Sequence, residues 1–352
     1  MPKRPLPDRS EQSTVQQKTV SLALQGGGAH GAFTWGVLDR LLEDERLVID
    51  GISGTSAGAM NGTMLVYGMA IGGRAGAREM LQTFWRRIAE CASYGIFQPT
   101  PLDRLLGRHD LDRSPLYWAF DAVTRVLSPY QLNPTGVNPL GEILSELVDF
   151  DRPQAAADIK LFVCATNVRT GKIRVFQPHE ISVDALLASA CLPTLFRAVE
   201  IESECYWDGG FMGNPAMFPL LNACQANDII LIEINPIRIE ETPTTARAII
   251  DRMKDISFNA TMMREMRTIA FVTQLLEQHR LTNKTRYRRI LFHMIEAERE
   301  IARFGVSSKL NADWDFLTTL FELGRSTAAQ WLDRHYDSLG NEPSMDLQKL
   351  FF

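Results

Sequence analysis

Long apolar runs are absent from this chain of 352 residues, because no stretch of 18 consecutive apolar residues occurs in it. A helix that crosses a bilayer needs about 20 such residues, so the sequence excludes a membrane-spanning helix. An excess of basic residues is also absent: 37 Lys and Arg face 42 Asp and Glu, and the net charge is −5. We therefore expect no nucleic-acid partner.

Cysteine is scarce, and the five cysteines form no C-x-x-C pair. They are Cys91, Cys164, Cys191, Cys205 and Cys224. The first 17 residues are polar, contain proline and lack the apolar core of a secretory leader. We therefore expect a cytoplasmic protein with reduced thiols, without disulfides or a zinc site. Residues 1–18 are expected to form a disordered tail.

The chain does have the composition of an ordinary globular protein, with 45% hydrophobic and 22% charged residues. Its length accommodates one large α/β domain, which we place at 19–240, and a smaller region after it. Between 91 and 140 the periodic pattern weakens and prolines become frequent. This predicts an inserted segment of short helices and loops that covers a site. Residues 241–352 are predicted to form a mainly helical C-terminal region.

The stretch GISGTSAGAMNG contains the pattern G-x-S-x-G with Ser56 at its centre. An apolar run at 47–49 predicts a buried strand before it, and apolar residues at helical spacing predict a helix over 57–70. Strand, glycine turn and helix are the setting of a nucleophile elbow, where Gly54 and Gly58 leave room for the neighbouring chain. The alternative is an ordinary glycine-rich turn between a strand and a helix.

A second glycine motif, QGGGAHG, follows a strand predicted over 19–24 and precedes a predicted helix. Gly26, Gly28 and Gly31 spell G-x-G-x-x-G, and Asp50 ends the next predicted strand. This arrangement fits a dinucleotide-binding site. One alternative is therefore an oxidoreductase that binds a dinucleotide here.

The other interpretation uses both glycine motifs together. The backbone N–H groups of Gly27 and Gly28, placed beside Ser56, would point at the oxyanion that forms when a serine attacks a carbonyl. Glycine is required there because a side chain would block the substrate. The second strand also runs from Asp50 almost at once into the serine turn, where an adenine ribose would have to lie. We therefore favour an oxyanion hole.

A serine hydroxyl needs a base, and none of the six histidines stands out as one. They are His30, His109, His179, His279, His293 and His335. In an α/β-hydrolase the histidine follows on a late loop, whereas His293 falls in a predicted strand and the others in helical, charged or irregular surroundings. His30 belongs to the glycine loop, where its side chain points out of the turn or lines the pocket rim.

Asp208, in the sequence WDGGF, is a candidate for the missing base. It follows a short predicted strand and precedes Gly209 and Gly210, with a third glycine at Gly213. Flanking glycines allow a carboxylate to approach another backbone closely. Taken alone, the residues favour a common D-G-G turn.

In this order, the motifs GGGAHG, GTSAG and DGG resemble those of the patatin-like phospholipase family, over about 20–234. The segment ASACLP, Ala188 to Pro193, is similar to the A-S-x-A-x-P segment of that family, with Cys191 in place of the second alanine. The C-terminal part, which includes SSKLNADWDFLTTLFELGR, resembles the tail of a bacterial branch of the family.

The resemblance implies a three-layer α/β/α fold with a mostly parallel central sheet and a serine–aspartate dyad that works without histidine. It assigns Ser56 as the nucleophile and Asp208 as the base. It assigns the oxyanion loop to Gly26, Gly27 and Gly28, and supporting roles to Gly54, Gly58, Gly209 and Gly210. The implied reaction is hydrolysis of an acyl ester of a phospholipid or related lipid, as in a phospholipase A, with no metal or organic cofactor.

Two stretches are candidates for peripheral contact with a membrane. One is a predicted helix with Met253, Met262, Met263 and Met266, whose apolar side chains alternatively belong to the core. The other is the basic stretch at 279–289, which alternatively is a solvated face. A non-catalytic lipid-binding protein that retains the motifs is a further alternative to an enzyme.

Overall fold

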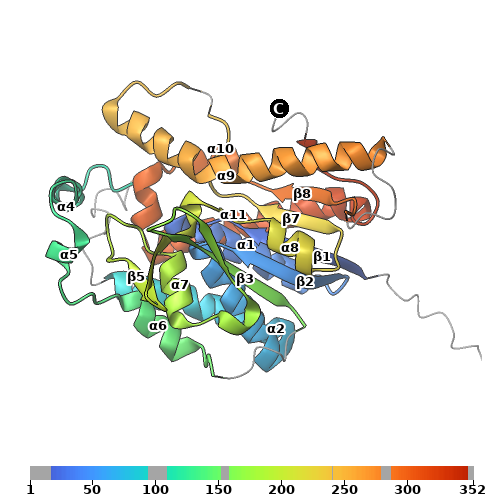
Figure 1. The fold of residues 1–352 in the computed structure, drawn as a ribbon, viewed down its shortest axis with the longest axis horizontal. Helices are drawn as coiled ribbons and strands as arrows, with labels where there is room; N and C mark the ends of the chain where they lie inside the picture. Colours follow the sequence, from blue (N-terminus) through green and yellow to red (C-terminus); the bar gives the residue numbers. More distant parts are fainter. Residues whose placement is uncertain (1–16, 94–108, 152–157, 240, 279–286, 348–352) are drawn as a thin grey trace, which may run out of the picture.

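The fold is built on one mixed sheet. The computed structural model describes residues 17–93, 109–151, 158–239, 241–278 and 287–347. These residues form eight strands in the order β5-β6-β3-β2-β1-β7-β8, with β4 also paired to β3 (Figure 1). The strands are β1 (Lys18–Leu24), β2 (Leu47–Gly54), β3 (Lys160–Asn167), β4 (Ile173–Phe176), β5 (Val199–Ile201), β6 (Glu204–Asp208), β7 (Asp228–Ile232) and β8 (Leu291–Ile295). The ladder from β3 through β2, β1 and β7 to β8 is parallel, whereas β4, β5 and β6 pair antiparallel.

The helices lie between these strands and after them. They are α1 (Gly31–Glu43), α2 (Ala57–Ser93), α4 (Pro115–Thr124), α5 (Pro129–Leu132), α6 (Pro139–Leu147), α7 (Val183–Ser189), α8 (Phe218–Ala223), α9 (Ala246–Glu277), α10 (Glu298–Ala302) and α11 (Trp314–His335). Short 3-10 turns are η1 (Gly28–His30), η3 (Pro178–Glu180), η4 (Gly209–Phe211), η5 (Val306–Leu310) and η6 (Tyr336–Ser338). None of the described helices is both long and apolar enough to cross a bilayer.

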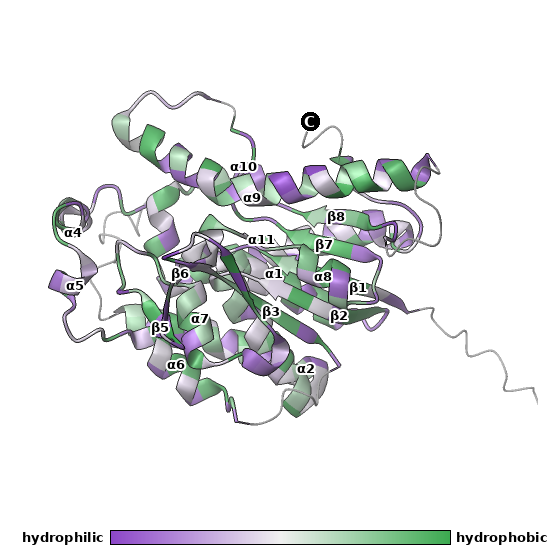
Figure 2. Cartoon of the chain, viewed as in Figure 1, coloured by the Kyte–Doolittle hydropathy of each residue, from purple (hydrophilic) through white to green (hydrophobic). Residues whose placement is uncertain are grey.

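Side chains of the central strands alternate between two apolar cores. On β1, Leu22 and Leu24 pack with α1, α2, α6, α7 and α11, whereas Ala23 faces the other side. There, α8 and α9 cover the sheet, and Met262 and Met266 of α9 are fully buried. The core interpretation of the methionine-rich helix is thus correct for these two residues. Apolar residues dominate the central strands in Figure 2. The three-layer α/β/α fold with a mostly parallel sheet is confirmed.

The C-terminal region packs on the sheet that the preceding residues form. Strand β8 extends the sheet beside β7, and α11 lies directly on α1. A Cβ atom added to Gly36 of α1 would lie only 2.0 Å from the carbonyl oxygen of Phe321 on α11. A Cβ at Gly324 would likewise lie 2.1 Å from the oxygen of Phe33. Glycines at the crossing therefore let the two backbones touch.

Two predicted segments fall partly outside the described residues. Of the tail predicted over 1–18, the structure describes only 17 and 18, and β1 begins at Lys18. Of the inserted segment predicted over 91–140, residues 94–108 are not described. Its remaining part contains α4, α5 and the start of α6, each with proline at the first helical position, where the missing N–H costs nothing.

Candidate active site

Ser56 occupies a strained turn between β2 and α2. Its φ angle is 52°, in the left-handed region that residues other than glycine rarely adopt, at a cost on the order of 1–3 kcal/mol. Its backbone N–H donates to the hydroxyl oxygen of Ser189 at 2.9 Å, and the neighbouring Thr55 hydroxyl donates to the carbonyl of Gly213 at 2.6 Å. The side chain is half-buried. This is the backbone arrangement of a nucleophile elbow.

The glycines of this turn lie where backbone segments nearly touch. A Cβ atom at Gly58 would lie 2.2 Å from the carbonyl oxygen of Leu24, at the end of β1. A Cβ at Gly54 would lie 2.7 Å from the backbone of Gly58. Any larger residue at Gly58 would therefore push the first turn of α2 away from the sheet.

Asp208 ends β6 and reaches the serine from the antiparallel side of the sheet. It is 1% exposed, its Oδ1 accepts the N–H of Gly210 at 2.7 Å, and the Ser56 side chain lies close enough to influence its charge. Burial raises the pKa of Asp208 to about 7, and the hydrogen bond from Gly210 and the nearby Ser56 hydroxyl oppose that rise. At neutral pH this carboxyl group is therefore poised to accept or donate a proton.

The segment Ala188–Pro193 contacts both residues. Ser189 accepts the Ser56 N–H, as described above, and the carbonyl of Cys191 accepts the N–H of Asp208 at 2.8 Å. Cys191 acts through its backbone there, while its thiol packs against the carbonyl of Arg197. Cysteine can therefore replace alanine at this position without changing the contact to Asp208.

The glycine loop lies directly against Ser56. A Cβ atom at Gly26 would lie 2.8 Å from the Cβ of Ser56. The Gly26 N–H donates to Oδ1 of Asn214 at 2.7 Å, so this amide is not free to bind an oxyanion. In the part of the chain that the structure describes, we find no acceptor for the N–H groups of Gly27 and Gly28, which leaves these two as the available donors of the loop.

Asn214 is a site residue that sequence reasoning missed. It is fully buried, and its side-chain Nδ2 has no partner among the described residues. The signal in the sequence was the Asn-Pro pair that follows the D-G-G motif, since a proline there fixes the chain beside the preceding asparagine. Gly213, just before it, is held by Thr55, so one turn links the serine loop to the glycine loop.

His30 points away from Ser56, into the C-terminal region. It is 2% exposed, packs against Phe304 and Phe316, and its Nε2 lies 2.7 Å from the hydroxyl of Ser308. The Ser308 hydroxyl donates to a carbonyl, so Nε2 carries the proton. Burial, with a smaller effect of the Lys309 charge, lowers the pKa of His30 to about 3. The side chain points out of the turn and does not line a rim.

The remaining histidines have other surroundings. His109 stacks on Phe316, His293 of β8 bonds to Asp228 at 3.0 Å, and His335 packs on Trp331. His179 is exposed, and His279 lies outside the described residues. None of the five described histidines hydrogen-bonds Ser56.

Asp50, the acidic residue that a dinucleotide-binding site would use, lies away from the glycine loop. Asp50 accepts the N–H groups of Gln225 and Ala226, just before β7 begins, whereas the glycine loop follows the other end of β1. Asp50 therefore does not lie where a ribose bound to that loop would need it. Among the described residues, no group of three or more His, Cys, Asp or Glu is arranged to hold a metal ion.

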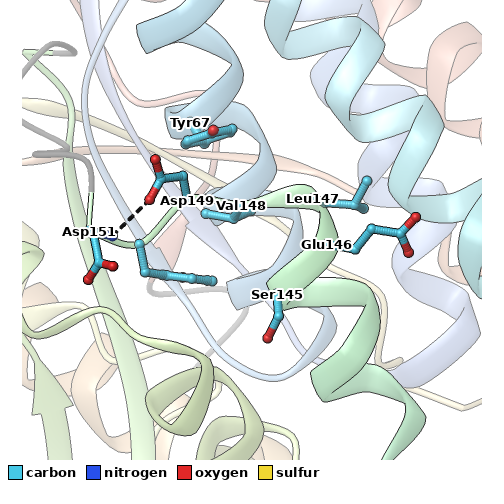
Figure 3. A pocket seen from close by; sticks show the side chains of 8 residues that line it. Tyr67, Ser145, Glu146, Leu147, Val148, Asp149 and Asp151 are labelled. Carbon is cyan, nitrogen blue, oxygen red and sulfur yellow. Dashed lines mark hydrogen bonds between the residues drawn. The ribbon is translucent and has the colours of Figure 1, made fainter.

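One hollow of the described surface lies elsewhere. It has a volume of about 420 Å³ and is lined by Tyr67 of α2 and by residues 145–151 at the end of α6. Figure 3 shows Tyr67 close to Asp149, whose carboxylate accepts the N–H of Asp151 at 3.2 Å. None of the predicted site residues lines this hollow, so we assign it no part in the chemistry.

Comparison with known proteins shows the family of this chain. Residues 22–221, more than half of the chain, match the model of the patatin-like phospholipases. A Vibrio cholerae protein named cGAMP-activated phospholipase is 26% identical over 241 residues, which are 60% of this chain and 59% of that protein. The chain thus spans less than two thirds of this relative.

Two solved structures are similar at low identity. VipD from Legionella pneumophila is 16% identical with a TM-score of 0.41, and the match covers 91% of this chain and 67% of VipD. ExoU in its complex with SpcU, from Pseudomonas aeruginosa, is 17% identical with a TM-score of 0.37, over 92% of this chain and 52% of that one. From the family match over most of the α/β core, we conclude that this chain belongs to the patatin-like phospholipase family.

Proposed function

We propose that this protein is a serine acyl hydrolase that releases fatty acid from a phospholipid or related lipid ester. The single observation that carries the proposal is the pairing of a strained, half-buried Ser56 with a buried carboxylate at Asp208. The membership in the patatin-like phospholipases supports a lipid as the substrate.

The reaction follows from the roles of these groups. Ser56 Oγ attacks the ester carbonyl while Asp208 accepts its proton, and the N–H groups of Gly27 and Gly28 bind the oxyanion. The intermediate collapses when Asp208 returns the proton to the departing alcohol, which leaves an acyl group on Ser56. Asp208 then takes a proton from the water that attacks the acyl-enzyme, and it returns this proton to Ser56 Oγ as the fatty acid leaves. The pKa of about 7 suits a group that both takes and returns a proton.

We also propose that a lipid surface contacts the apolar segment, which we define as residues 116–137. Large apolar side chains are exposed along it: Leu116, Trp118, Val123, Val126, Leu127, Tyr130, Leu132 and Val137. An exposed apolar patch of this extent marks an interaction site, and Trp and Tyr are the aromatic residues that membrane interfaces favour.

Contacts tie the apolar segment to the catalytic residues. Arg197 lies over the ring of Tyr130, 4.9 Å from its centroid, and donates to the carbonyl of Pro134. The carbonyl of Arg197 in turn accepts the thiol of Cys191, whose own carbonyl holds Asp208. A lipid surface on the apolar segment would therefore lie beside the site, where ester groups must arrive.

The test is covalent labelling with a fluorophosphonate, followed by peptide mapping. The probe should modify Ser56, because an activated hydroxyl attacks phosphorus quickly, and phospholipid vesicles should yield free fatty acid. Ser56→Ala should lose both, whereas the control Ser145→Ala, at an exposed serine on α6, should keep both. Fatty-acid release by Ser56→Ala at the wild-type rate would refute the proposed function. Vesicle binding without any turnover would favour a non-catalytic lipid-binding protein.

A further inference from the structure

We infer that Lys309, from the C-terminal region, is a positioning residue that orients and polarises the oxyanion loop through Asn235. The inference rests on the proposed function, because it concerns how the glycine loop presents its N–H groups. The inference gives the C-terminal region a part in the chemistry, whereas the other residues assigned to the site all precede residue 236.

The peptide between Gly26 and Gly27 is fixed from behind. The carbonyl of Gly26 accepts the Nδ2–H of Asn235 at 2.6 Å. This carbonyl and the N–H of Gly27 belong to one planar trans peptide, so they point in opposite directions. By holding the carbonyl on one side, Asn235 directs the Gly27 N–H to the other side.

Asn235 is itself held by an ammonium group. Nζ of Lys309 donates to Oδ1 of Asn235 at 2.9 Å and to Oδ1 of Asp255, on α9, at 2.9 Å. The Lys309 side chain is only 20% exposed, so water screens its charge incompletely. A cation at Oδ1 makes the Asn235 amide a stronger donor, and the stronger bond to the Gly26 carbonyl makes the Gly27 N–H a stronger donor in turn.

The same C-terminal turn also supports the loop through its backbone. Gly28 has a φ of +59°, and a Cβ atom there would lie 2.3 Å from the carbonyl oxygen of Lys309. One residue earlier, Ser308 accepts the Nε2–H of His30 at 2.7 Å. The turn η5 therefore meets the glycine loop at two points besides the contact through Asn235, and only the Asn235 contact carries charge.

Steady-state kinetics separate this role from a merely structural one. Lys309→Met keeps an unbranched apolar stem of similar shape and removes the ammonium group, with its charge and its donors. We expect kcat to fall about 10-fold to 100-fold, less than for the loss of a whole oxyanion donor, with KM nearly unchanged. The melting temperature should fall as well, because Asp255 loses its cation, so the fall in kcat is the readout. The rate of fluorophosphonate labelling should fall in parallel, because the phosphonyl oxygen occupies the same hole. The control is Lys254→Met, an exposed lysine on α9, which should behave as wild type.

A second variant tests the same inference if Lys309→Met does not fold. Asn235→Asp keeps an oxygen for Lys309 and replaces the donor to Gly26 by a second oxygen. Its kcat should fall, as that of Lys309→Met does. The double variant should have a kcat no lower than the less active single variant, because both substitutions act through the same contact to Gly26.

Three outcomes would overturn the inference. Wild-type kcat in Lys309→Met, with Ser56→Ala inactive, would refute the positioning role and leave the proposed function standing. A loss in Lys309→Met that appears in KM and melting temperature and not in kcat would make the residue structural. Activity in Ser56→Ala would refute the proposed function and the inference with it.

Discussion

The Ser56 side chain lies close enough to the carboxylate of Asp208 to lower its pKa, although β2, which Ser56 follows, and β6, which Asp208 ends, run in opposite directions. Strand β3 explains this meeting, because it lies between them. Gly54 of β2 pairs with Val163, and Asp208 of β6 pairs with Ala165, two residues further along β3. A parallel neighbour on one side and an antiparallel neighbour on the other therefore bring nucleophile and carboxylate to the same end of the sheet.

The first prediction is that Asp208, and no histidine, is the base. Asp208→Asn should lose nearly all ester hydrolysis, because the amide cannot take a proton from Ser56. Replacement of each of the six histidines by Gln or Asn should leave most activity, since none of the five described ones bonds to the serine. The measurement is turnover and fluorophosphonate labelling across all seven variants. A histidine variant that folds and is as inactive as Asp208→Asn would require a triad.

The second prediction concerns pH. Asp208 acts as a base only when it is ionised, and burial raises its pKa to about 7. At pH values below this pKa, kcat/KM should fall about tenfold per pH unit. Above it, kcat/KM should not depend on pH. The labelling rate with a fluorophosphonate, which has no group that titrates in this range, should follow the same curve. An acid limb near pH 4 would mean that the carboxylate is solvated during the reaction.

The third prediction compares two glycines with nearly equal φ angles. Gly28 and Gly73 have φ of +59° and +61°, but a Cβ at Gly73 meets nothing within 4 Å, whereas one at Gly28 meets Lys309. Both alanine variants should lose unfolding free energy on the order of 1–3 kcal/mol from backbone strain. Only Gly28→Ala should also lose turnover, by about 100-fold to 1,000-fold, because the loop must move away from the oxyanion. Equal turnover in the two variants would show that the loop has another role.

The fourth prediction concerns the apolar segment. Val126 is 81% exposed, so Val126→Asp should not disturb packing, yet it places a charge where lipid would lie. Binding to phospholipid vesicles in a sedimentation assay should weaken, while hydrolysis of a short soluble ester stays at the wild-type rate. Ile71→Asp, at an exposed apolar residue on α2, is the matched control and should bind vesicles normally. Unchanged binding by Val126→Asp would remove the segment from the lipid contact.

Local features of this protein were determined by the sequence. The strand at β2, the serine turn and α2 follow from an apolar run, closely spaced glycines and a helical period, which act over a few residues. The same holds for β1 and the glycine loop. The order of three short motifs also indicated the family, which the match over residues 22–221 confirms. The roles of Ser56 and Asp208 remain predictions that the experiments above address.

Only the tertiary structure decided which distant groups meet. The sequence placed Asp50 at the end of a strand and so allowed a nucleotide site, but the register of β1 with β2 and β7 puts it beside Gln225, away from the glycine loop. His30 lies in that loop, yet its side chain packs into the C-terminal region. The Asn-Pro pair marks a turn at Asn214 but not its bond to Gly26, and Lys309 carries no recognisable pattern, because their partners are contacts of the folded chain. Sheet pairing and helix packing set these contacts, and spacing along the chain does not encode them.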